Sequence, residues 1–362
     1  MKKVLFATTA IVAFAGAASA DVAVSGYAEM GIADTDSSEG GVSTDTQDAG
    51  FYSALDVYFD MTGETDGGIT FGASIDLEDA AETGGNNADT FGNAGADYTV
   101  FVSGAFGTLT MGDTDGALDW AMTEAGNVGN PGTIADNETT HAGYLGAYGD
   151  GAGDNTVLRY DYSVGDFGMA VSVEQSTIAG GNPVVPTTVN PTDGENGYAV
   201  GLRYSMDMGG ASVALGAGIQ KAVFDGASGY GPVPAAAIIA GDEADIVGVS
   251  VAVTSGAFQA GVTFTQHDFE DAAGVAFADV DHIGVGVGYT AGALSLHANY
   301  GEFDGTGATA ADIIEADGFG IAAAYDLGGG ATAHFGYNDS DTNLLGDLSD
   351  ASSWSLGLSM AF

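Results

Sequence analysis

The sequence predicts an all-β fold, a transmembrane antiparallel up-and-down β-barrel of about 16 strands. Three observations support this class. Large apolar residues alternate with small or polar residues along many segments, short glycine-rich links alternate with long polar links, and the last segment shows the same alternation with no turn after it. This last strand must therefore pair with one made earlier. An even number of strands lets it pair with the first and brings both termini to one end.

The last segment, SSWSLGLSMAF, shows the alternation most clearly. Its large residues share one parity, and Ser, Gly and Ala fill the other. A period of two indicates a β-strand with two chemically different faces. The same pattern recurs in VAVSGYAEMGI, FYSALDVYFDM, ITFGASIDL, FGMAVSVE, GYAVGLRYSMDM, HIGVGVGY, ALSLHANY, FGIAAAYDL and ATAHFGYN.

Links of two lengths separate these segments. Short links that fit tight hairpins lie at 63–68, 164–168, 207–211, 254–258, 290–294 and 326–331. Long polar links are expected at about 36–48, 80–96, 178–196, 225–243, 271–279, 304–317 and 340–351. Short turns at one end and long loops at the other are typical of a membrane barrel.

A soluble, acidic, salt-adapted β protein is the rival interpretation of the same alternation. The aromatic residues favour the membrane barrel, because those on the apolar parity fall mostly near strand ends, where interfacial girdles lie. The aromatic residues in question are Phe59, Phe71, Phe106, Phe167, Tyr204, Phe258, Tyr289, Tyr300, Phe319, Tyr325 and Phe335.

The first twenty residues are predicted to be a cleaved secretory signal peptide. Lys2 and Lys3 precede a short apolar stretch that ends in the small residues Ala18-Ser19-Ala20. A membrane anchor is the alternative, but the apolar stretch is short for a spanning helix. Residues 21–362 then form the barrel, and the absence of cysteine means that the exported fold does not depend on disulfides.

The predicted mature chain is strongly acidic. It keeps three basic residues against 50 carboxylates, a formal charge of 3 − 50 = −47. Because nucleic-acid binding needs a basic patch, we expect no nucleic-acid partner. A hydrophobic fraction of 45% is too high for an intrinsically disordered chain.

One connection, residues 114–154, is much longer than the others. It is either a mobile external loop or a loop folded into the lumen, where it narrows the pore. In the second case the segment ALDWAM forms a helical turn, and Asp115, Asp119 and Glu124 face the passage. Its apolar members then pack on the inner wall: Leu118, Trp120, Met122, Tyr144 and Leu145.

Three segments and the aromatic C-terminal strand resemble general diffusion porins of alphaproteobacteria. The segments are MTGETDGGITFGAS, TVFVSGAFGTLTMGDTDGAL and YDLGGGA. The resemblance implies a sixteen-stranded barrel in the outer membrane of a Gram-negative bacterium and a homotrimer surrounded by lipid and lipopolysaccharide. It also implies a third external loop that forms the constriction. It implies further that Phe362 is the assembly signal recognised by the barrel-assembly machinery.

The sequence departs from that family in its charges. The resemblance implies loop carboxylates facing arginines on the wall, yet Glu29, Asp56, Asp60 and Asp76 occupy lumen parity on the first strands. Two arginines of lumen parity, Arg159 and Arg203, are too few for a basic wall. We therefore expect an acidic, cation-preferring pore, unless most carboxylates lie in external loops.

A calcium site is the best metal hypothesis. Asp113, Asp115 and Asp119 lie close together in and after GDTDG, and carboxylates are the ligands that Ca²⁺ prefers. A salty habitat explains the acidity equally well. No cofactor is expected to be required.

No enzymatic motif is visible. The five histidines His141, His267, His282, His297 and His334 fall in neither a GxSxG nor an HExxH frame, and four of them are interpreted as polar residues of the pore wall. The predicted function is passive diffusion of small hydrophilic solutes and ions. A substrate-specific channel is the alternative, but Tyr27, Tyr52, Tyr58 and Phe101, which have inward parity, indicate no ligand.

Overall fold

The computed structural model describes residues 21–39, 42–43, 49–77, 97–153, 156–175, 196–224, 230–231, 233, 238–307, 313–344 and 347–362. The predicted signal peptide lies outside these residues, as does most of the links expected at 80–96 and 178–196. No helix in the described ranges is long and apolar enough to cross a membrane.

Antiparallel strands make up nearly all of the described chain. They are β1 (Asp21–Glu39), β2 (Val42–Ser43), β3 (Gly50–Glu64), β4 (Thr70–Leu77), β5 (Asp97–Gly104), β6 (Gly107–Gly112), β7 (Val157–Val164), β8 (Phe167–Glu174), β9 (Gly197–Asp207), β10 (Ser212–Val223), β11 (Glu243–Ser255), β12 (Phe258–Glu270), β13 (Ala276–Ala291), β14 (Leu294–Thr306), β15 (Ile313–Gly328), β16 (Ala331–Leu344) and β17 (Asp347–Ala361). Between β6 and β7 lie a short helix, α1 (Ala117–Ala121), and a 3-10 turn, η1 (Ala125–Asn127).

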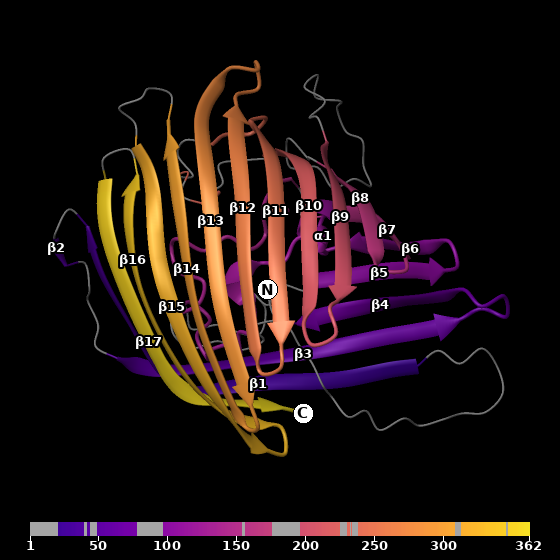
Figure 1. The fold of residues 1–362 in the computed structure, drawn as a ribbon, viewed down its shortest axis with the longest axis horizontal. Helices are drawn as coiled ribbons and strands as arrows, with labels where there is room; N and C mark the ends of the chain where they lie inside the picture. Colours follow the sequence, from indigo (N-terminus) through magenta and orange to yellow (C-terminus); the bar gives the residue numbers. More distant parts are fainter. Residues whose placement is uncertain are drawn as a thin grey trace.

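The sheet closes on itself. Each long strand pairs antiparallel with the next, and β1 pairs with β3 on one edge and with β17 on the other. Figure 1 shows β1 in indigo meeting the yellow β17 at the bottom of the barrel. The backbone of Phe362 extends this seam, since its N–H donates to Gly26 O at 2.9 Å and its carbonyl accepts from Gly26 N at 3.2 Å. Apart from the two-residue β2, the described strands form a sixteen-stranded closed barrel, which confirms the predicted fold class.

The two faces of each strand differ as the alternation predicts. Along β12, Val262 and Phe264 are exposed on the outer surface, whereas Thr263 and Thr265 are buried inside the barrel. The predicted short links are all turns between neighbouring strands.

Three long links are shorter in the structure than the sequence indicated. The connection β12–β13 spans 271–275, β14–β15 spans 307–312 and β16–β17 spans 345–346. The prediction was wrong there because it ended each strand where apolar residues stop. Backbone pairing needs no apolar side chain, and the ladder continues through carboxylates such as Asp281, which lies opposite Asp304.

Candidate functional site

The long link between β6 and β7 lies inside the barrel. We call residues 113–156 the inserted loop. Its helix α1 contacts β7, β8, β9 and β10, and η1 contacts β11, β12, β13 and β14. The helix forms within the predicted ALDWAM segment. These two elements therefore lie against the half of the inner wall formed by β7–β14, and other parts of the loop reach β16 at His334 and Asn338.

Glycines on the wall allow the backbone of the loop to lie directly on the backbone of the strands. A Cβ atom added at Gly286 would be 1.9 Å from Ala125 O, and one added at Gly301 would be 1.9 Å from Gly143 O. Any side chain at these positions would displace the loop toward the lumen.

Inward polar side chains on the wall anchor the loop backbone. Thr263 Oγ1 accepts from Ala125 N at 3.0 Å and donates to Thr123 O at 2.7 Å, while Ser172 Oγ accepts from Ala117 N at 2.8 Å. Further anchors contribute in the same way: Gln220, Ser250, His282, His297, Asn299, His334 and Asn338. These contacts satisfy backbone groups that would otherwise be buried without a partner.

An apolar cluster inside the barrel fills the space between the inserted loop and inward-facing side chains of the wall. Leu118 of α1 is fully buried, and Phe269 and Phe303 from β12 and β14 are 1% exposed. Tyr230 lies edge-on to Phe269, with ring centroids 5.7 Å apart. The predicted packing of the apolar loop residues is thus present for Leu118 and Met122, which belong to this cluster, and for Trp120 and Leu145, which are partly buried against it.

The remaining lumen is a cavity of about 1590 Å³. Its lining comes mainly from the inserted loop and from the wall of β1, β3, β4 and β5. Twelve carboxylates are among the described residues that line it: Glu29, Asp56, Asp60, Asp76 and Asp97 on that wall, Asp113, Asp115, Asp119, Glu124, Asp136 and Asp150 on the loop, and Asp326. With one arginine, Arg203, the formal charge of this lining is −12 + 1 = −11.

The two arginines with lumen parity occupy different places. The guanidinium of Arg203 lies 3.7 Å over the ring of Trp120, so one face of this cation is covered. Arg159 is not among the cavity-lining residues. It donates from Nη1 to Asp115 O at 2.5 Å, and its Nε is 3.6 Å from Asp161 Oδ1. Arg159 thus holds the start of the inserted loop.

The tyrosines of inward parity gather beside the wall carboxylates. Tyr27, Tyr52 and Tyr58 line the cavity, and Tyr58 donates to Asp56 Oδ2 at 3.2 Å. Phe101 is not in its lining.

The three aspartates of the calcium hypothesis also line the cavity. However, no group of three or more His, Cys, Asp or Glu residues in the described part of the chain is placed to hold a metal ion.

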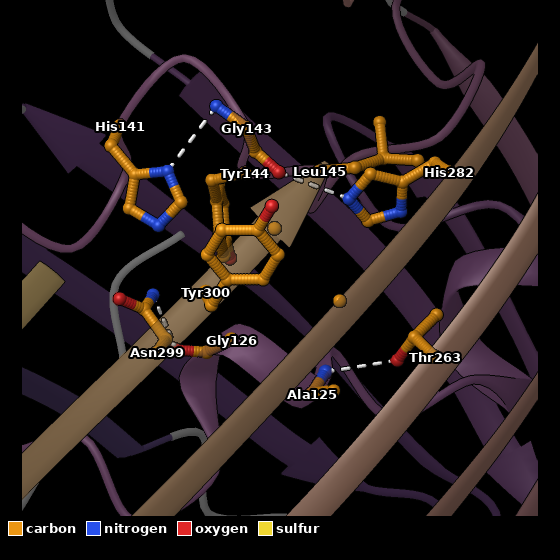
Figure 2. Close-up of a pocket in the computed structure, with 12 residues that line it drawn as sticks. Ala125, Gly126, His141, Gly143, Tyr144, Leu145, Thr263, His282, Asn299 and Tyr300 are labelled. Carbon is orange, nitrogen blue, oxygen red and sulfur yellow. Dashed lines mark hydrogen bonds between the residues drawn. The ribbon is translucent and has the colours of Figure 1, made fainter. Parts of the chain in front are cut away.

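Four of the five histidines were predicted to line the pore, and for three of them this prediction is wrong. His334 lines the cavity, but His267, His282 and His297 are buried at 1–4% exposure. His282 Nε2 lies 3.1 Å from Gly143 O, and Figure 2 marks this contact with a dashed line. The cavity in that view has a volume of about 10 Å³, enough for a single water molecule and too small for a solute.

Burial shifts the pKa values of four titratable groups of the loop, and it raises those of Tyr144 and Tyr148 well above the usual range. It raises the pKa of the Asp150 carboxyl to about 7, although Gly116 N and Gln220 Nε2 donate to it and oppose the shift. It lowers the pKa of His141 to about 4. Asp150 is therefore only partly ionised at neutral pH.

A model of the Gram-negative porin family matches residues 7–344 of this chain. The chain belongs to the Gram-negative porin family. It is 37% identical over 141 residues to a porin of Rhodobacter capsulatus, a match that covers 38% of this chain and 43% of that protein. The chain thus matches less than half the length of this relative.

Solved structures of porins share the fold. A porin structure refined at 1.8 Å superposes with a TM-score of 0.62 at 24% identity, covering 94% of this chain and all of that one. A triple mutant of Rhodopseudomonas blastica porin gives 0.56 at 18% identity, with the same coverage. The trimer form of Vibrio cholerae OmpT, an outer membrane protein, gives 0.62 at 15% identity, covering 95% of this chain and 99% of that chain.

Family membership decides four points raised by the sequence. It confirms the porin resemblance and the location in a Gram-negative outer membrane, and it excludes the soluble acidic β protein. Because this is a family of channels, it also confirms that the chain is not an enzyme.

Proposed function

We propose that this porin forms a water-filled channel for the passive diffusion of small hydrophilic solutes and ions, with a preference for cations. The observation that carries the proposal is a lumen whose two main walls both bear carboxylates. The inserted loop reduces the open cross-section and so sets the size limit for solutes.

The charge of the lining sets the sign of the selectivity. Two unit charges about 4 Å apart interact by about 1 kcal/mol in water and about 4 kcal/mol at an effective dielectric of 20. Counter-ions screen this interaction over about 8 Å at physiological ionic strength. A cation in the lumen is therefore stabilised and an anion is repelled. Arg203 offsets little of this field, because it is one charge against twelve.

Predicted partners follow from the same assignment. We propose a homotrimer, as in the trimer form of OmpT, contacting lipid and lipopolysaccharide. Phe362 is proposed as the signal for the barrel-assembly machinery. The calcium site at Asp113, Asp115 and Asp119 stays a prediction, to be tested by equilibrium dialysis with ⁴⁵Ca²⁺.

Planar-bilayer recording of the purified, folded protein tests the proposal. We expect stepwise conductance and a zero-current potential of cationic sign under a tenfold KCl gradient. Steps with a potential near zero would retain the channel and exclude the acidic selectivity. Folded, inserted protein without steps would contradict the channel itself, and saturation of the current by one solute would indicate a substrate-specific channel.

A further inference from the structure

Two neighbouring inward residues of β14 hold the inserted loop at its middle. His297 Nε2 lies 2.8 Å from Gly126 O, and its Nδ1 lies 3.1 Å from Val128 O. Asn299 Nδ2 donates to the same Gly126 O at 3.0 Å and to Thr139 O at 2.8 Å. Gly126 and Val128 lie on the part of the loop that leaves β6, and Thr139 lies on the part that returns to β7.

A single amide group therefore ties the outgoing and returning parts of the loop to the wall. Other anchors act on one part at a time, as Thr263 does at Thr123 and Ala125. Losing the β14 contacts would weaken the attachment of both parts together, although the other anchors would remain.

Neither side chain lines the lumen cavity of about 1590 Å³. His297 is 4% exposed and Asn299 is 5% exposed, and both lie behind the loop. The loop residues that they hold do line the cavity, since Val128 and Thr139 both face it. A change at β14 therefore reaches a solute only through the position of the loop.

We propose that His297 and Asn299 are positioning residues that fix the depth of the inserted loop and thereby set the size limit of the pore. This inference rests on the proposed channel function. It assigns no solute contact to either residue and leaves the charge of the lining unchanged.

Substitution by leucine tests the proposal. Leucine is close to asparagine in size and removes every donor, so Asn299→Leu and His297→Leu each leave loop carbonyls without their partner. The loss of a buried hydrogen bond should increase the fraction of protein in which the loop is detached from the wall. We therefore expect a larger single-channel conductance and a roughly tenfold faster entry of a trisaccharide into proteoliposomes. The zero-current potential should keep its cationic sign.

His297→Gln serves as the conservative variant, because its amide retains one N–H donor for the loop. It should lie between wild type and His297→Leu in both readouts. Ser355→Ala is the matched control, since Ser355 is a fully buried inward residue of β17 whose hydroxyl makes no hydrogen bond within the described structure. It should behave as wild type.

Wild-type conductance and wild-type sugar entry in folded leucine variants would overturn the proposal. If these variants do not fold, His297→Gln decides, and an unchanged size limit in that variant would also overturn it. Absence of conductance in the wild-type protein would instead reject the proposed function.

Discussion

Neutralising two carboxylates of the inserted loop should reduce cation preference by a calculable amount. Asp115→Asn with Asp119→Asn changes the formal charge of the cavity lining from −11 to −9. A carboxylate about 8 Å from an ion in water contributes about 0.5 kcal/mol, and screening over one Debye length reduces this to about 0.2 kcal/mol. The pair thus contributes about 0.4 kcal/mol to a cation and the opposite to an anion, so the cation-to-anion permeability ratio should fall roughly fourfold.

The assay is the zero-current potential of single channels under a tenfold KCl gradient, compared between wild type and the double variant. Asp268→Asn with Asp279→Asn is the matched control, because it removes the same charge from exposed positions on the outer surface. Conductance should persist in both proteins. If the control variant shifts the potential as much as the loop variant does, total charge, rather than the charge of the lining, sets the selectivity, and the prediction is wrong. An unchanged potential in the loop variant would show that these two residues lie away from the constriction.

Three further predictions concern the loop and the outer surface. Burial lowers the pKa of His141 from 6.5 to about 4, so the free energy of unfolding should fall as the pH drops from 6.5 to 4. His141→Asn should remove up to about 3 kcal/mol of this pH dependence, as measured by denaturant titrations at several pH values. If the free energies of unfolding of wild type and variant change with pH in the same way, this prediction is wrong. Gly301→Ala should lower stability by about 1–3 kcal/mol through overpacking against the loop, whereas Gly210→Ala, with no atom within 4 Å of the new Cβ, should not. Carboxylates lie directly opposite one another on the outer surface, as at Asp268 and Asp279, and repel each other. Because salt screens this repulsion, added salt should raise the midpoint temperature of thermal unfolding. A midpoint that does not change with salt would mean that these pairs do not destabilise the fold.

The fold could be predicted because its main signal is local. A residue such as Phe264 or Thr265 is assigned to a face by its parity alone, and a barrel repeats this assignment on each strand. The long loop was found from its length, because residues 114–154 form a connection much longer than the others, and the ALDWAM segment forms the expected turn of helix. The wall carboxylates Glu29, Asp56, Asp60 and Asp76 were found by the same parity and do line the cavity.

Other features depend on contacts that parity does not report. The parity of Arg159 predicted that its side chain points inward. It could not show that the guanidinium donates a hydrogen bond to the backbone carbonyl of Asp115 in the loop. It likewise placed His297 inside the barrel and could not show that the loop lies between that ring and the lumen. The sequence did contain one indication of where the loop packs on the wall. Consecutive strands carry inward hydrogen-bond donors and glycines, as at Gly286 and Gly301.

An acidic lining should place cations in the lumen between the inserted loop and the wall of β1, β3, β4 and β5. Crystals soaked in rubidium bromide test it most directly, because both ions give anomalous signals at separate X-ray edges. We expect rubidium peaks between wall carboxylates such as Asp56 and loop carboxylates such as Asp115, with no bromide there. Bromide in that space, or rubidium confined to the outer surface, would contradict it.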